Sequence, residues 1–113
     1  MTVNEILVQT LSPFGKKVTT DFDGGNEEEY ITFNPASDRA EGFADDTPFA
    51  VVTAMQIHWF LPSSKNYLSE KKAIRNALFE AGFSYPEVTV IPESKERRHI
   101  IFECEIENDF ELE

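Results

Sequence analysis

The end of the chain alternates between apolar and acidic residues. Every odd position from 103 onward carries a carboxylate: Glu103, Glu105, Glu107, Asp109, Glu111 and Glu113. The even positions include Ile100, Phe102, Cys104, Ile106, Phe110 and Leu112. Because successive side chains of a β-strand point to opposite faces, this segment predicts a strand with one buried face and one acidic face. Carboxylates at every second residue, roughly 6.6 Å apart, repel each other and repel polyanions.

The charge of the whole chain narrows the function classes. The 113 residues suffice for a single domain spanning 1–113, and the 41% hydrophobic content with ten Phe suffices for a core. Twenty-one acidic residues against ten basic ones give a net charge of -11. Non-specific nucleic-acid binding needs a basic surface, so we expect no nucleic-acid binding, although a local basic patch is compatible with this charge.

The cysteine content and the hydropathy bear on the compartment. Cys104 is the one cysteine, so no internal disulfide can form, and its apolar strand position favours a buried, inert thiol in a reducing compartment. No run of about 18 apolar residues is present, and the N-terminus lacks the pattern of a signal peptide. We therefore expect no membrane association and action in the compartment of synthesis.

Two segments have helical periodicity. Thr2 and Glu5 have the spacing of a capping box, which predicts a short helix at the N-terminus. A second helix is predicted from about residue 66 to residue 81, with a buried stripe that Leu68 and Phe79 widen. Gly82 follows this helix as a C-terminal cap.

Strands are predicted at 16–22, 30–33, 50–61 and 87–91 and from residue 97 onward. The segment 50–61 has apolar residues on both faces, so we expect cover on much of both sides, with Trp59 in the core. The segment 34–48 has no clear period and contains two prolines and a glycine, which predicts a long functional loop anchored by Phe43. Together these elements predict an α+β fold, in which a single mainly antiparallel sheet of about four to five strands packs against two helices.

The side chains capable of chemistry do not form a recognisable catalytic set. His58 and His99 lack metal-ligand spacing, and Asp45 and Asp46 lack the calcium-loop pattern. Cys104 is predicted on an apolar face, where a reactive thiolate is disfavoured. We expect no enzyme activity, no metal and no cofactor. A small enzyme that uses Asp45, Asp46 and a histidine is the least favoured hypothesis.

Basic residues gather in two zones, one on the predicted second helix and one near residue 97. They are Lys65, Lys71, Lys72 and Arg75, and Lys95, Arg97 and Arg98. Such clusters can be ordinary solvated surface. Separate acidic and basic zones on one chain also suit head-to-tail association, in which two different surfaces of identical subunits meet.

Several blocks of the sequence resemble small tail-assembly proteins of phages and prophages. These blocks are Glu29-Tyr30-Ile31-Thr32-Phe33-Asn34, Phe43-Ala44-Asp45-Asp46, Gln56-Ile57-His58-Trp59-Phe60, Asn66-Tyr67-Leu68 with Lys71-Lys72 and Ala77-Leu78, Ala81-Gly82-Phe83-Ser84-Tyr85-Pro86, and Arg98-His99-Ile100-Ile101-Phe102-Glu103-Cys104-Glu105. The element order is similar to that of tail-terminator and tail-completion (head-tail joining) proteins. The resemblance implies a structural virion protein that forms a ring, commonly a hexamer. It implies tail-tube and head-connector proteins as partners, and the virion, or the host cytoplasm during assembly, as the location.

The resemblance also suggests a role for the acids, because a carboxylate-lined channel repels DNA phosphates during ejection. The strand acids, or the loop from Asp38 to Asp46, are candidates for that lining. The candidate intersubunit or channel-facing residues are Asp38, Phe43, Asp45, Asp46, Lys71, Lys72, Arg75, Arg97, Arg98, Glu103, Glu105 and Glu107. An alternative function is an acidic DNA mimic that inhibits a host DNA-binding protein.

Overall fold

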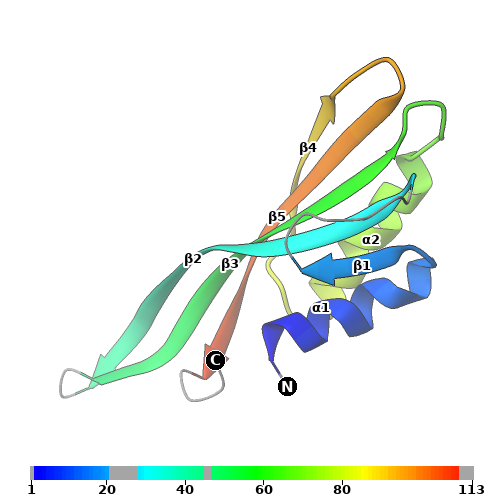
Figure 1. The fold of residues 1–113 in the computed structure, drawn as a ribbon. Helices are drawn as coiled ribbons and strands as arrows, with labels where there is room; N and C mark the ends of the chain where they lie inside the picture. Colours follow the sequence, from blue (N-terminus) through cyan, green and yellow to red (C-terminus); the bar gives the residue numbers. More distant parts are fainter. Residues whose placement is uncertain (1, 21–27, 45–46, 110–113) are drawn as a thin grey trace.

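The computed structural model describes residues 2–20, 28–44 and 47–109. In chain order the elements are α1 (Val3–Leu11), the 3₁₀ turn η1 (Ser12–Phe14), β1 (Lys17–Thr20), β2 (Tyr30–Ala44), β3 (Thr47–Pro62), α2 (Leu68–Glu80), β4 (Glu87–Pro92) and β5 (Arg97–Asp109). The strands form one sheet in the order β1-β2-β3-β5-β4 (Figure 1). Among the described strands, β1 pairs with β2 in parallel, and the other three pairings are antiparallel. This architecture confirms the predicted α+β fold.

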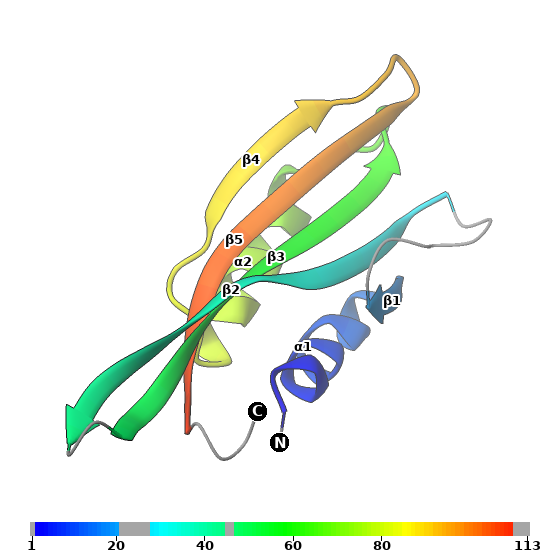
Figure 2. The same cartoon turned by 60° about the vertical axis from the view of Figure 1, so that its left-hand side comes forward.

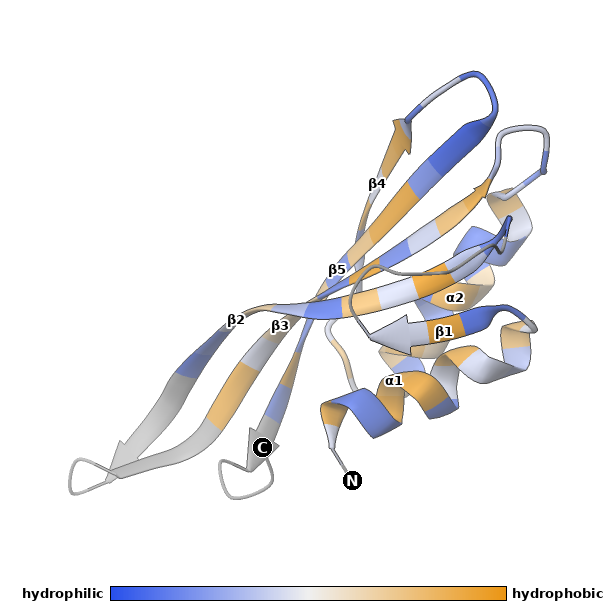
Figure 3. Ribbon diagram, in the orientation of Figure 1, coloured by the Kyte–Doolittle hydropathy of each residue, from blue (hydrophilic) through white to orange (hydrophobic). Residues whose placement is uncertain are grey.

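Both helices lie on the same side of the sheet, as Figure 2 shows most clearly. The strand residues beneath them alternate with residues that face away, which appears in Figure 3 as alternating hydropathy along β3 and β5. The fully buried residues include Ile57 and Trp59 of β3, Ile100 and Phe102 of β5, and Leu7 of α1. Trp59 is therefore a core residue, as predicted.

The N-terminal helix begins at the predicted capping box. The hydroxyl of Thr2 accepts the backbone N–H of Glu5 at 3.2 Å, and the Glu5 carboxylate accepts the backbone N–H of Thr2 at 3.1 Å. Each bond satisfies an N–H that lacks a partner within the helix. Leu7 and Leu11 then pack fully buried against the sheet.

The buried stripe of α2 is narrower than predicted. Ile74 and Leu78 are fully buried, whereas Leu68 is 59% and Phe79 is 55% exposed. The prediction for these two residues was wrong because a turn of 100° per residue places them on the flanks of the helix, away from Ile74 and Leu78. The Asn66 side chain, rather than one of the serines before it, accepts the N–H of Leu68 at 3.1 Å.

The end of α2 agrees with the prediction. Gly82 has φ 111°, a conformation that side-chain-bearing residues rarely adopt. The chain then turns back, so that the N–H of Phe83 donates to the carbonyl of Leu78 at 3.2 Å and the Phe83 ring is buried.

The segment 34–48 is not the predicted loop. β2 continues to Ala44 and β3 begins at Thr47, so the described part of the segment forms most of β2 and the first residues of β3 in a long antiparallel hairpin. Among the described residues, β1 pairs with β2 as far as Phe33, so Pro35 lies on an edge of the sheet, where a missing N–H is tolerated. The register shifts between Pro35 and Ser37, as in a β-bulge. Pairing with β3 thus satisfies the backbone hydrogen-bonding groups of this segment despite the proline.

Beyond this shift, the sheet extends past the helices. We define the arm as residues 37–44 of β2, 47–54 of β3 and 105–109 of β5, which run together in both views (Figures 1 and 2). The principal extents of the molecule are 54 × 23 × 23 Å. The arm therefore gives a small domain one long dimension.

Candidate functional site

The side of the sheet opposite the helices, here called the open face, has no described helix over it (Figure 2). His58 and Phe60 of β3 point to this face and are half-buried. The prediction that β3 is covered on much of both sides was thus wrong for this region, because no described helix covers the open face. His58 and Phe60 are half-buried because neighbouring side chains of the sheet screen them from water. Tyr30, Phe60 and His99 stack in a line across β2, β3 and β5, with ring centroids 4.8 and 4.2 Å apart.

The predicted acidic face of the last strand is confirmed where its side chains are described. Glu103, Glu105 and Glu107 lie on the open face, and the alternating residues Ile100, Phe102, Cys104 and Ile106 are at most 8% exposed. Glu87 of β4 pairs with Glu103 in the register, which adds a fourth carboxylate. We call these four glutamates the acidic row. Asp109 is in β5, and Glu111 and Glu113 lie outside the described residues.

One carboxylate of the acidic row has a strong partner. Arg39 of β2 donates from Nη1 and Nη2 to the two oxygens of Glu105, at 2.7 and 3.1 Å. These hydrogen bonds lower the pKa of Glu105 below its usual value. Sequence reasoning missed this pair because its members are 66 positions apart and meet only through the β2–β3–β5 register. Glu87, Glu103 and Glu107 are exposed.

The two predicted basic zones meet at one end of α2. The guanidinium of Arg98 lies 4.5 Å from the centre of the Tyr67 ring, and Lys71 Nζ lies 5.7 Å from it. Arg97 is separated from Arg98, because consecutive strand residues face opposite ways, and lies 5.7 Å from the Tyr30 ring on the open face. Only Arg98 therefore joins the basic residues of the helix.

Further along α2, basic and aromatic side chains form an exposed group. Arg75 lies 4.3 Å from the Tyr85 ring, and its Nε donates to the carbonyl of Pro86 at 2.7 Å. Phe79 contacts the same ring edge-on, with centroids 5.6 Å apart. Lys72 is exposed on the same helix. We define the helix patch as Lys71, Lys72, Arg75, Phe79 and Tyr85. Arginine and aromatic residues are over-represented at the centres of protein interfaces.

The remaining candidates come from the predicted loop. Asp38 is exposed on β2 and pairs with Thr53, a residue on the helix side of β3, so it does not extend the acidic row. Phe43 pairs with Pro48 in the arm, and its side chain is outside the described part. Asp45 and Asp46 lie outside the described residues. The enzyme hypothesis, which uses Asp45 and Asp46, therefore concerns residues outside the described part of the chain.

The two histidines are in contact on the open face, although no sequence pattern predicted their pairing. His58 Nδ1 lies 2.8 Å from His99 Nε2. The outer nitrogens also have partners: His58 Nε2 lies 3.0 Å from Asn34 Oδ1, and His99 Nδ1 lies 3.0 Å from Glu93 Oε1. Burial lowers the pKa of both histidines, with a further lowering of His58 by His99, whereas Glu93 opposes the effect at His99.

Four charged side chains surround the edge of Trp59. The indole Nε1 donates to Glu29 at 2.8 Å, and Lys65 Nζ lies 2.9 and 2.8 Å from the two Glu29 oxygens. Lys16 pairs with Glu70 and with Glu29, and its side chain is only 7% exposed. Burial lowers the pKa of Lys16. Burial raises the pKa of Glu29, but hydrogen bonds from Lys65 and Trp59 bring it below the usual value. This network stabilises the junction of the sheet with the start of α2.

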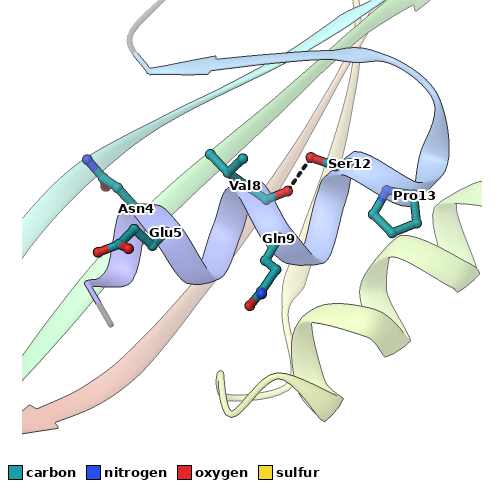
Figure 4. Close-up of a pocket in the computed structure, with 6 residues that line it drawn as sticks. All are labelled: Asn4, Glu5, Val8, Gln9, Ser12 and Pro13. Carbon is teal, nitrogen blue, oxygen red and sulfur yellow. Dashed lines mark hydrogen bonds between the residues drawn. The ribbon is translucent and has the colours of Figure 1, made fainter.

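A shallow pocket runs along the exposed side of α1 (Figure 4). It is lined by Asn4, Glu5, Val8, Gln9, Ser12 and Pro13. Its one ionisable group is Glu5, whose pKa is lowered by the hydrogen bonds with Thr2 in the capping box. The hydroxyl of Ser12 donates to the carbonyl of Val8. These polar groups are already used by the helix, so the pocket offers no acid–base pair for catalysis.

Two further observations bear on chemistry. Burial raises the pKa of Cys104 to about 12, so the thiol is protonated at neutral pH and is a poor nucleophile. Across residues 2–20, 28–44 and 47–109, no three His, Cys, Asp or Glu side chains converge as metal ligands would.

Neither of the described helices has the length and apolar character needed to cross a membrane.

The chain was also compared with known proteins, and neither a protein-family model nor a curated protein sequence matches it.

Proposed function

We propose that the protein is a structural subunit of a phage tail or neck, a ring-forming terminator or completion protein that caps the tail tube and joins it to the head connector. The observation that carries this proposal is the separation of charge between the two layers. The acidic row is on the open face, and the basic residues of the helix patch are on α2, which lies on the other side of the sheet. Tyr85 of the patch lies between the two, because it lines a surface pocket with Glu87, Glu103 and Glu105. The sequence blocks that resemble tail-assembly proteins support the same function.

Opposite charge on opposite layers favours contact between unlike surfaces of two copies. In such a head-to-tail contact, Lys72 and Arg75 of one copy approach Glu103 and Glu107 of the next, with Phe79 supplying apolar contact area. A contact between unlike surfaces closes into a ring when the rotation per subunit permits it. The long arm extends the surface that neighbouring copies can share. Carboxylates left outside the contact repel DNA phosphates, which suits a channel through which DNA passes.

Charge reversal tests the contact. We expect Lys72→Glu and Glu103→Lys each to weaken self-association in low salt, because each places like charges opposite one another. The double variant restores association, because the attraction is kept with its direction reversed. Lys17→Glu, an exposed reversal on β1, is the matched control and should associate like the unmodified chain. Sedimentation velocity over a range of concentrations measures the effect, and equal behaviour of all four variants would count against the contact.

Deletion of the gene from its phage or prophage tests the function itself. We expect tails of abnormal length that fail to join heads, as seen by electron microscopy. Tails of normal length joined to heads would refute the proposed role. The DNA-mimic alternative predicts a different outcome: the purified chain would capture a DNA-binding protein from host lysate, and salt would disrupt that complex. In the acidic row, the Arg39–Glu105 pair weakens any resemblance to a continuous phosphate backbone.

A further inference from the structure

The hydrogen bonds of the histidine pair fix the number of protons that it carries. Asn34 Oδ1 and the Glu93 carboxylate can only accept hydrogen bonds, so the outer nitrogens, His58 Nε2 and His99 Nδ1, must both donate. The inner nitrogens face each other at 2.8 Å, and one proton must lie between them. The arrangement thus holds three ring protons, one more than two neutral imidazoles carry. With the Asn34 amide oxygen facing His58, this arrangement suits a pair with a single positive charge.

Other protonation states fit this geometry poorly. With four ring protons, two N–H groups would face each other at 2.8 Å. With two ring protons, one outer nitrogen would present a lone pair to an acceptor. At Glu93 that contact is repulsive, because a carboxylate has no proton to donate. At Asn34 it can be relieved, because the amide can turn over and present its Nδ2–H₂ group to His58.

We propose that His58 and His99 form a single proton-binding site that accepts one proton and excludes a second, and that Asn34 reverses its amide when the proton binds. Asn34 immediately precedes the register shift at the base of the arm, and Glu93 lies in the turn between β4 and β5. One proton therefore completes a line of hydrogen bonds from the base of the arm to the far hairpin. A second proton breaks this line at its centre.

Among the described residues, no other side chain is hydrogen-bonded to the ring nitrogens of the pair. On β2, the Tyr30 hydroxyl is 3.5 Å from Arg97 Nη1 and its ring stacks on Phe60. Arg97 is the nearest same-face cation along β5, and Ile91 is the register partner of His99 on β4. Glu103 lies further along the same face of β5. Burial of the imidazoles and the repulsion between them both oppose a second proton.

Long-range ¹H–¹⁵N NMR of the imidazoles tests the proton count on the intact protein. Between pH 8 and pH 5, we expect the pair to take up one proton, and the side-chain amide resonances of Asn34 to shift with the same midpoint. Uptake of two protons with independent midpoints, or of none, would overturn the proposal. In His58→Gln, His99 loses the imidazole nitrogen that shares the inner proton, so its midpoint should fall below that of the pair in the unmodified chain. An unchanged midpoint would also overturn it.

Substitution of Asn34 provides a second test that does not remove a histidine. Asp at this position can only accept, so Asn34→Asp should favour the charged pair and raise the midpoint of proton uptake by more than half a pH unit. Asn76→Asp adds the same charge at an exposed position of α2 and serves as the matched control, with no expected shift. Equal midpoints in the two variants would show that Asn34 is not part of the proton-binding site.

Discussion

Replacement of Trp59 by alanine tests the packing of the core most severely. The side chain is fully buried. A buried aromatic side chain removes roughly 150–250 Å² from water, which at about 25 cal/mol per Å² is about 4–6 kcal/mol as an upper bound. Large-to-small substitutions of this type cost about 3–5 kcal/mol when measured. Glu29 keeps its bonds to Lys65, so no buried carboxylate is left without a partner. We therefore expect a loss of about 3–5 kcal/mol in the free energy of unfolding.

Urea denaturation followed by far-UV circular dichroism measures this loss, since the substitution removes the one tryptophan that fluorescence would report. With an m-value of about 1.5 kcal/mol per M, the midpoint should fall by about 2–3 M. Trp59→Phe is the matched control, because it keeps most of the ring and loses the bond to Glu29. We expect it to lose about 1–2 kcal/mol. A midpoint of Trp59→Ala within about 0.3 M of the unmodified chain would refute the placement of this residue in the core.

Three further predictions concern stability and reactivity. Gly82→Ala should lower the melting temperature by about 4–8 °C, because φ 111° costs a side-chain-bearing residue about 1–2 kcal/mol, whereas Gly82→Asn should lose less; equal melting temperatures for Gly82→Ala and the unmodified chain would contradict this. Cys104, 4% exposed and with its pKa raised to about 12, should react with a thiol reagent at pH 8 only after unfolding, and rapid labelling of the native chain would be inconsistent with its burial. The histidine pKa values are lowered in the folded chain, so the unfolded chain binds more protons and stability should fall as the pH drops below about 6.5, by up to about 1.4 kcal/mol per pH unit for each proton of difference. Denaturation midpoints at pH 7.5 and pH 5 measure this, and a His58→Gln/His99→Gln double variant should show a smaller drop; an identical drop would contradict it.

Short-range patterns predicted the elements in which local rules and tertiary packing agree. The capping box at Thr2 predicted the start of α1, Gly82 predicted the end of α2, and the alternation from Ile100 predicted both faces of β5. In each case, the residue types that favour the local structure are also those that packing requires at that position.

The failures have a common cause in pairing that the sequence does not display. Pro35 and the weak periodicity after it predicted a loop, but an edge strand tolerates a proline, and β3 supplies the partner that makes the segment a strand. The contact between His58 and His99 arises from the β3–β5 register, with 41 positions between the two residues. A register of this kind can be read only from the assembled sheet.

The charge separation was predictable only in part. The alternation predicted the acidic row, but Arg39 was not recognised as its partner. The basic zones were predicted as separate, whereas Lys71 and Arg98 meet at Tyr67, and Arg97 faces the other side of the sheet. Phe79 was predicted in the core and instead gives the helix patch part of its apolar surface.

The proposed ring depends most on the contact between the helix patch of one copy and the acidic row of the next. Zero-length carbodiimide cross-linking of a mixture of ¹⁴N- and ¹⁵N-labelled chains tests this contact directly, because mixed-isotope products identify links between copies. The proposed contact predicts mixed-isotope links from Lys71 or Lys72 on α2 to Glu103 or Glu107 on the open face of the sheet. Links between copies that consistently join other surfaces, or no such links at any concentration and at low salt, would contradict it.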